Sequence, residues 1–318
     1  MNIAFRGLHL ALATSFRSHN NFRSFHRWVR PTLQQLYHKK KKMGPFEPNP
    51  RSEYLEWNYE SELYSFGKRI GEEFHSSLLK NALIEKSYIV KEEERQRAVG
   101  IEPDSSVKDN SNMAVDGEKI ISSYVTQYLE TTLPCLPKKY IRNLKEYLLS
   151  EEILARVSKG IGIDDIVLCA DYPVTNCTLA RTLKSVVQAL ALSSGIERAN
   201  GFVRDLIIVE LVGKDLTEFC TPENPLDTLQ TLLKEIGAEP AEPRLITEAG
   251  RNTLLASYQV GIYSDKKMIG RGFGESISTA VDMAACDSLW RKWGINSQRR
   301  PFPFKLELPP KLTAGSCQ

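Results

Sequence analysis

Apolar residues recur along most of this chain with the spacing of buried helix faces. In the stretch TLARTLKSVVQALALSSG (residues 178–195) they stand at positions i, i+4, i+7, i+8 and i+11, from Leu179 to Leu190. A helix with that stripe places Arg181, Lys184 and Gln188 together on the opposite face. The pattern predicts a buried helix that carries one short polar stripe, and the purpose of that stripe is the first question the sequence raises.

Helical periodicity dominates the chain up to about residue 215. It runs from Tyr59 to Tyr88 and returns in the stretches at 118–129, 140–162 and 197–213, whereas strand-like alternation is absent. The polar residues 91–112 include Pro103, which predicts a loop or a frayed helix end, and the Pro-rich residues 44–58 predict a connector. Residues 59–215 are therefore expected to form an all-α domain.

The period changes after a break at residues 216–224. Residues 225–295 predict a helix, three strands and a second helix from about Ser276 to Trp293, with a turn at Asp265–Lys267 between the last two strands. The Pro-rich, basic residues 296–318 have too little apolar periodicity to fold alone and are expected to lie extended on a partner. The predicted fold class is α+β and multidomain: an all-α domain followed by an α-β-β-β-α domain.

Charge separates the N-terminal segment from the rest. Before Glu47 the chain has five arginines, the run Lys39–Lys42 and no acidic residue, so this segment supplies +9 and leaves −6 for the remainder of a chain whose total is +3. An acid-free, Arg- and Ser-bearing start is typical of a mitochondrial transit peptide, predicted over residues 1–43 without a readable cleavage point. The alternative is a basic arm that binds nucleic acid.

The composition of the whole chain argues against several classes of protein. Apolar residues make up 42% and charged residues 25% of 318, as in soluble globular proteins, and no apolar run is long enough for a membrane span. The six cysteines form no CxxC pair, which argues against a zinc site or a disulfide framework. Only His75 lies outside the N-terminal segment, so the rest of the chain has a single histidine for acid–base catalysis or metal binding.

The all-α region resembles a ribonuclease III endonuclease domain. LLKNALIEKSYI is similar to that family's opening "LL..ALTH.SY" segment, Asn110 and Gly117 hold places of its "NERLEFLGDAVL" signature, and residues 179–195 match its "LADAFEALIGALYLDGG" helix. The resemblance implies a fold whose enzymes hold two Mg²⁺ ions with four acidic side chains. The matching positions here are Ala114, Glu118, Arg181 and Lys184.

Only one carboxylate survives at those four positions. A cation about 4 Å from a divalent ion costs roughly 8 kcal/mol at an effective dielectric constant of about 20. Arg181 and Lys184 would therefore expel Mg²⁺, and we expect no catalytic residue, no metal and no cofactor. Asp116 is discounted as a substitute ligand because the family packs a leucine there. Whether the basic stripe contacts RNA phosphate or is a solvated helix face stays open.

The C-terminal module resembles a double-stranded-RNA-binding domain. Gly272, Gly274 and Ser276 hold the frame of that family's "G.G.SKK.AK..AA..AL" helix entry, but Ile277, Ser278 and Val281 replace its lysines. The loop after the first strand offers Arg251 and Asn252. Ile277 and Val281 either face a protein partner or extend the core.

The combination resembles the family of mitochondrial large-subunit ribosomal proteins numbered forty-four. The resemblance implies a non-enzymatic constituent of the mitochondrial ribosome, in the matrix, whose partners are large-subunit rRNA and other mitochondrial ribosomal proteins. From charge and loop position, the candidate RNA-binding residues are Arg251, Asn252, Lys266, Lys267, Arg299 and Arg300. Ribonuclease III domains pair through the signature helix, so a pairing surface is expected around Met113, Val115, Ile120 and Ile121. The alternatives are a matrix RNA-binding or ribosome-assembly factor and, more remotely, a Mg²⁺-dependent endonuclease.

Overall fold

The computed structural model describes residues 30–42, 51–54, 57–100, 102, 108–251, 253–295 and 302–303. The chain divides into two compact units, Met1–Asn49 and Pro50–Gln318. In the first unit, residues 30–42 form an exposed helix that includes Lys39–Lys42. Residues 1–29, which hold most of the predicted transit peptide, lie outside the described residues. Everything below concerns the second unit.

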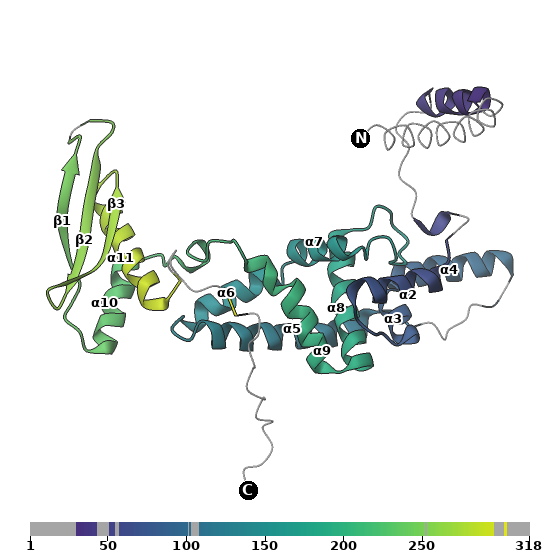
Figure 1. Ribbon diagram of the computed structural model, residues 1–318, viewed down its shortest axis with the longest axis horizontal. Coiled ribbons are helices and arrows are strands. Elements are labelled where there is room, and N and C mark those ends of the chain that lie inside the picture. The colour runs from purple at the N-terminus through teal and green to yellow at the C-terminus, as the bar shows by residue number, and fades with distance from the viewer. Residues whose placement is uncertain are drawn as a thin grey trace, which may run out of the picture. The chain divides into compact units, whose positions relative to one another are not determined.

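The N-terminal part of the second unit is all-α, as predicted (Figure 1). Its helices are α2 (Tyr59–Ile70), α3 (Ser76–Ala82), α4 (Lys86–Val99), α5 (Ser111–Thr132), α6 (Lys138–Leu148), α7 (Glu151–Ile161), α8 (Asn176–Ser194) and α9 (Ile196–Leu206), followed by the short 3₁₀ helices η2 (Ile208–Leu211) and η3 (Glu218–Cys220).

Helix α8 forms the centre of this domain. It packs against α3, α5, α7 and α9, and the apolar stripe from Leu179 to Leu190 is fully buried. The side chain of Thr175 caps its N-terminus by accepting a hydrogen bond from the backbone N–H of Thr178 (3.3 Å). The predicted helix at 178–195 is thus confirmed, and its polar stripe lies on a helix that is covered on most sides.

The helix boundaries differ from the sequence pattern in two places. The continuous periodicity from Tyr59 to Tyr88 is divided among α2, α3 and the start of α4, with breaks at residues 71–75 and 83–85. Residues 86–99 continue as α4 through the segment expected to be a loop or frayed end. That helix has no buried residue, so its sequence KEEERQR carries helix-forming residues without an apolar stripe.

The second module has the predicted α-β-β-β-α order. Helix α10 (Pro225–Ile236) begins with Pro225 and is followed by β1 (Glu242–Ala249), β2 (Ser257–Ser264), β3 (Lys267–Gly274) and α11 (Ile277–Trp293). The strands form one antiparallel sheet in the order β1-β2-β3. Asp265 and Lys266 connect β2 to β3 with positive φ angles of 53° and 63°, the left-handed pair that a two-residue hairpin turn requires.

Helix α11 lies directly on β3 because the strand has no side chains on that side. A Cβ atom added to Gly270, Gly272 or Gly274 would lie 2.7 Å or less from backbone atoms of α11. Ser276 caps the helix in a reciprocal capping box with Thr279. The glycine alternation thus places the helix, and it assigns the residues between the glycines to the opposite face of the sheet.

Aromatic contacts connect the two modules of this unit. Tyr140 on α6 and Trp293 on α11 have ring centroids 4.9 Å apart, and Trp290 Nε1 donates to the carbonyl of Cys220 (3.4 Å). Phe302 is buried against Tyr128 of α5, whose hydroxyl donates to the carbonyl of Pro303 (2.9 Å). The expectation that the whole tail lies on a partner is therefore wrong at Phe302–Pro303, which pack within the chain. None of the helices in the described ranges is long and apolar enough to cross a membrane.

Candidate functional site

The four positions singled out by the ribonuclease III resemblance line one open hollow of about 410 Å³. Ala114 and Glu118 lie one turn apart on α5, and Arg181 and Lys184 lie one turn apart on α8. The two helices meet closely at Gly117, where an added Cβ would lie 2.7 Å from the carbonyl carbon of Lys184. The sequence thus brings all four side chains together through local helix spacing and one close helix contact.

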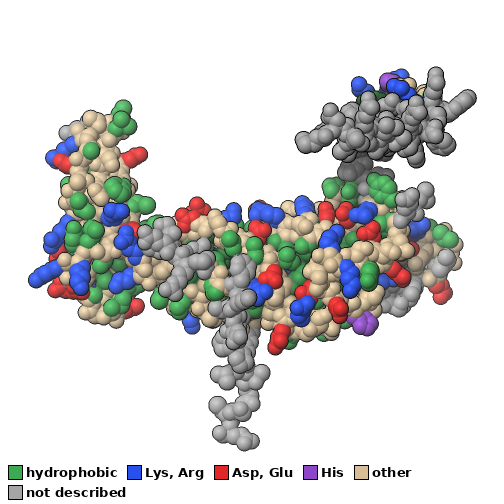
Figure 2. All heavy atoms as spheres, in the orientation of Figure 1, with side chains coloured by type: hydrophobic (Ala, Val, Ile, Leu, Met, Phe, Trp, Pro, Cys, Tyr) green, Lys and Arg blue, Asp and Glu red, His purple; other side chains and the backbone are tan. Residues whose placement is uncertain are grey.

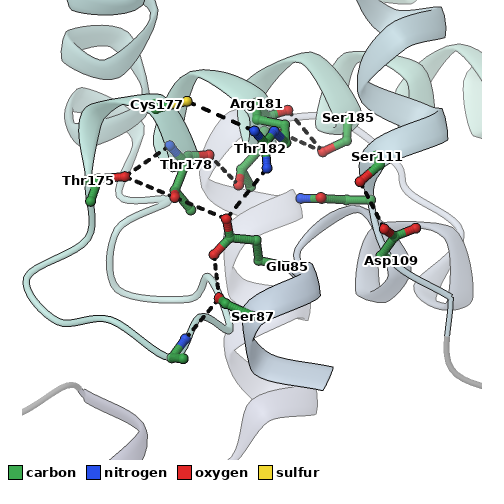
Figure 3. A network of polar contacts seen from close by, with 12 residues as sticks. Glu85, Ser87, Asp109, Ser111, Thr175, Cys177, Thr178, Arg181, Thr182 and Ser185 are labelled. Atoms are coloured by element: carbon green, nitrogen blue, oxygen red, sulfur yellow. Dashed lines mark hydrogen bonds and ion pairs between the residues drawn. The ribbon is translucent and has the colours of Figure 1, made fainter. Parts of the chain in front are cut away.

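Both basic residues of the hollow are paired with carboxylates. Lys184 Nζ donates to Glu118 Oε2 at 3.1 Å. Arg181 Nη1 lies 3.6 Å from Glu85 Oε1, a pair that Figure 3 shows. Glu85 precedes α4 and its side chain is only 13% exposed. It also accepts hydrogen bonds from Ser87 Oγ (2.7 Å) and from Thr178 Oγ1 (3.2 Å). Both cations of the basic stripe therefore have carboxylate partners within the chain, and an RNA phosphate contact at the partly exposed Arg181, one of the two alternatives from the sequence, stays a prediction.

The network of polar contacts joins the segment between α3 and α4 to helix α8. Figure 3 shows Glu85 reaching from the start of α4 toward Thr178 and Arg181 of α8. Behind them, Ser185 Oγ donates to the buried carbonyl of Ala82 (2.8 Å). Together these contacts tie the segment between α3 and α4 to the central helix, which is a structural use of the polar face.

The donor set of the hollow does not fit the two-metal site of ribonuclease III enzymes. Its lining includes the carboxylates of Glu118 and Glu151, and the first of these already pairs with Lys184. Arg181 and Lys184 add two positive charges, which oppose a divalent cation. Among the described residues there is no group of three or more His, Cys, Asp or Glu side chains placed to hold a metal. We therefore derive no hydrolytic step at this site.

Burial also makes three of the described cysteines unsuitable as nucleophiles. Burial raises the pKa of the thiols of Cys169 and Cys286 to about 11 and that of Cys220 to about 12. These side chains are therefore protonated at neutral pH, and the thiolate is the reactive form of cysteine.

The expected pairing surface on α5 is smaller than the sequence indicated. Ile121 is fully buried in the core and cannot contact a partner, which corrects the expectation at that position. Val115 is 56% exposed, and Met113 and Ile120 are half-buried. Asp116 pairs with Lys119 on the exposed side of α5 (2.8 Å) and is not part of the hollow's lining.

The candidate RNA-binding residues are distributed over separate places. Arg251 is exposed in the β1–β2 loop and lies 3.6 Å from Glu248. Lys266 and Lys267 are exposed at the β2–β3 turn, away from that loop at the other end of β2. Asn252, Arg299 and Arg300 lie outside the described residues. At the start of α11, Ile277 is 52% exposed whereas Val281 is half-buried and packs against the core.

Glu85 is the site residue that the sequence reasoning missed. It stands at the position of the histidine in the "ALTH.SY" segment, where a change from a neutral or basic side chain to an acid was visible in the sequence. Arg181 in turn stands where the family has an acidic residue. Taken together, Glu85 and Arg181 indicate that the segment before α4 and helix α8 have exchanged charges. The pairing itself joins residues far apart in the chain, so only the structure shows it.

Each of the two modules matches a known protein family. The family model described as "Large ribosomal subunit protein mL44, endonuclease domain" matches residues 58–190, and the model "MRPL44 dsRNA-binding domain" matches residues 220–314. The large ribosomal subunit protein mL44 of Caenorhabditis elegans is 33% identical over 293 residues, 91% of this chain and 73% of that protein.

Bacterial ribonucleases are more distant relatives. Ribonuclease 3 of Symbiobacterium thermophilum is 28% identical over 228 residues, 69% of this chain and 90% of that enzyme. The solved nuclease domain of ribonuclease III from Campylobacter jejuni matches 46% of this chain and 96% of its own length, with 18% identity and a TM-score of 0.39. The identity to the nematode protein extends through both modules, and this chain belongs to the family of large ribosomal subunit protein mL44.

Proposed function

We propose that this chain is a structural component of the large subunit of the mitochondrial ribosome, located in the matrix, which binds large-subunit rRNA and neighbouring ribosomal proteins and does not cleave RNA. The observation that carries the proposal is the 33% identity to a large ribosomal subunit protein over 91% of the chain. The Arg-rich, acid-free start supports the mitochondrial location.

The hollow between α5 and α8 supports the non-enzymatic part of the proposal. Its two cations occupy the positions where the ribonuclease III resemblance implies acidic ligands, and both are engaged by Glu118 and Glu85. Ion pairs inside one chain hold the helices together without a metal, so the nuclease-like domain keeps its fold while its site is closed to Mg²⁺.

The exposed part of the predicted pairing surface supports protein partners. Val115 is exposed beside the half-buried Met113, at the N-terminal end of α5. An apolar contact there would cover the side of the hollow that Val115 lines. The sequence does not decide between a second copy of this chain and another ribosomal protein, and both stay within the proposal.

Sedimentation of lysed mitochondria through a density gradient tests the proposal. We expect this chain to migrate with the large subunit in stoichiometric amount, both with Mg²⁺ and after Mg²⁺ chelation separates the subunits. Recovery only in light fractions or in precursor particles would refute the ribosomal role and favour an assembly factor. Incubation of the purified chain with duplex RNA and Mg²⁺ tests the second part, with ribonuclease 3 of Symbiobacterium thermophilum as the positive control; cleavage by this chain would refute it.

A further inference from the structure

The face of the three-stranded sheet that points away from α11 carries an unusual set of side chains. Because Gly270, Gly272 and Gly274 face the helix, Arg271 and Phe273 point to the other side. The register places Arg271 opposite Gly261 and Phe273 opposite Gln259. We call this side the outer sheet face. It consists of the side chains of β1, β2 and β3 that point away from α11, among them Arg244, Thr247, Gln259, Tyr263, Arg271 and Phe273.

Contacts between their side chains confirm that residues of β1 and β2 share one surface. Thr247 Oγ1 donates to Gln259 Oε1 across β1 and β2 (2.9 Å). The guanidinium of Arg244 lies 5.3 Å from the ring centre of Tyr263, which is a cation–π contact across the same strands. Ile246 covers Gly261, because a Cβ added to that glycine would lie 2.8 Å from the Ile246 Cδ1 atom. The surface is therefore continuous across β1 and β2, and the Ile246 side chain lies over Gly261 at its centre.

The outer sheet face combines aromatic rings with arginines. Phe273 is 59% exposed and Met268 is 48% exposed, so apolar area is open to a ligand. Arg271 is exposed, and no carboxylate of the described residues pairs with its side chain. Exposed rings and guanidinium groups on a sheet are the groups on which unpaired RNA bases stack. The guanidinium of Arg271, two residues before Phe273, can form charge-assisted hydrogen bonds with a phosphate of the same RNA strand.

Charge favours RNA over a protein as the occupant. The one acidic residue of the outer sheet face, Glu242, is already paired with Arg244 (2.7 Å). Lys266 and Lys267 stand exposed at the β2–β3 turn that borders the face, beside Asp265, which accepts a hydrogen bond from the backbone N–H of Glu239 (3.2 Å). In Figure 2, basic side chains stand toward that end of the module with acidic side chains among them, whereas apolar side chains stand at the β1–β2 end.

The surface expected from the double-stranded-RNA-binding resemblance is unsuited to phosphates. Leu254 and Leu255 in the β1–β2 loop are almost wholly exposed, and Arg251 lies beside Glu248. At the start of α11 the replaced lysine positions are Ile277, Ser278 and Val281. The surface where a duplex would bind therefore has few basic and aromatic side chains, whereas the opposite side of the sheet has more of them.

We propose that the outer sheet face binds a single-stranded segment of RNA, with bases stacked on Phe273 and a phosphate held by Arg271. This proposal rests on the proposed function, of which it names the RNA contact surface and the form of the RNA. It differs from the duplex-binding mode because it uses the outer face of the sheet in place of the β1–β2 loop and α11.

Binding of a fluorescein-labelled single-stranded RNA of about 12 nucleotides to the full chain tests the proposal, with fluorescence anisotropy as the readout. We expect Phe273→Ala to weaken binding at least about fivefold, the lower limit for loss of one stacked base. We expect Arg271→Ala to weaken binding and to lower the dependence of log affinity on log salt by about 0.7, as loss of one phosphate contact requires. Phe273 and Arg271 have no neighbours in the core, so both variants should fold, which circular dichroism checks.

Matched controls are available on other surfaces of the same module. Met283→Ala removes an apolar side chain of α11 that is 46% exposed, and Arg251→Ala removes a loop cation; both should bind the single strand like the unchanged chain. Unchanged affinity in Phe273→Ala and Arg271→Ala, preference for a duplex hairpin with loss in Arg251→Ala, or absence of any RNA binding would each overturn the inference. Continued sedimentation of the unchanged chain with the large subunit would then show that the proposed function stands and only the surface is wrong. Loss of a ribosomal protein contact in Phe273→Ala, without loss of RNA binding, would identify a protein as the occupant.

Discussion

Replacing Gly117 with alanine tests the close contact on which the geometry of the hollow depends. The new methyl carbon would overlap the carbonyl oxygen of Lys184 and would lie 2.7 Å from its carbonyl carbon, whereas ordinary contacts begin at 3.4 Å, so α5 and α8 must separate by more than the difference between these two distances. Because the obstacle is backbone of a buried helix, we expect the upper part of the roughly 1–3 kcal/mol cost of overpacking. Alanine regains about 1 kcal/mol of helix propensity. The net loss in the free energy of unfolding is then about 2 kcal/mol.

Gly160→Ala is the matched control for this prediction. Gly160 lies within helix α7, and nothing stands within 4 Å of its added Cβ, so only the propensity gain applies and the variant should be more stable by roughly 0.5–1 kcal/mol. Urea unfolding followed by circular dichroism measures both changes. Equal shifts of the two variants, or a Gly117→Ala variant as stable as the unchanged chain, would refute the contact between α5 and α8.

Three further predictions concern the site and the thiols. Arg181→Ala should lower the free energy of unfolding by about 1–2 kcal/mol, less than a fully buried pair because Arg181 is 43% exposed; adding Glu85→Gln should recover part of the loss, and strictly additive effects in urea unfolding would contradict the pairing. The triple change Ala114→Glu, Arg181→Asp and Lys184→Glu should make the melting temperature rise with Mg²⁺, which the unchanged chain should not show; no rise would mean that the alignment of α5 and α8 with the ribonuclease III motifs is wrong. At pH 8, iodoacetamide should label the exposed Cys135 and Cys177 in the native chain. It should label Cys220 and Cys286 only after unfolding, because burial raises the pKa of their thiols to about 12 and about 11. Rapid labelling of Cys220 in the native chain, detected by peptide mass spectrometry, would contradict its burial.

Elements with a clear apolar period were predictable from the sequence, and elements on the surface were less so. The helix predicted at 178–195 and the helix predicted from about Ser276 to Trp293 agree with α8 and α11 within a few residues, because both have a buried face. Helix α4 has no buried residue and therefore no stripe to detect, so its extension to Val99 was missed. The breaks between α2, α3 and α4 were missed because the apolar spacing continues across them.

The site was predictable in its members but not in its electrostatics. Helix spacing and the motif match brought Ala114, Glu118, Arg181 and Lys184 to one hollow, since short-range periodicity determines which side chains share a helix face. The partner of Arg181 could not be found that way, because Glu85 comes from another segment and no local pattern joins the two. Ile121 was misplaced for a related reason: a stripe on one long helix does not reveal which neighbour covers it.

The strand β3 has a consequence for how this protein can change over time. One side of the strand is only backbone, pressed against α11 at Gly270, Gly272 and Gly274, so stability depends there on the absence of side chains. The other side holds Arg271 and Phe273, which contribute nothing to the interior. A substitution at these two exposed positions therefore changes what the strand can bind without any repacking of the fold, whereas a side chain at any of the three glycines would displace the helix.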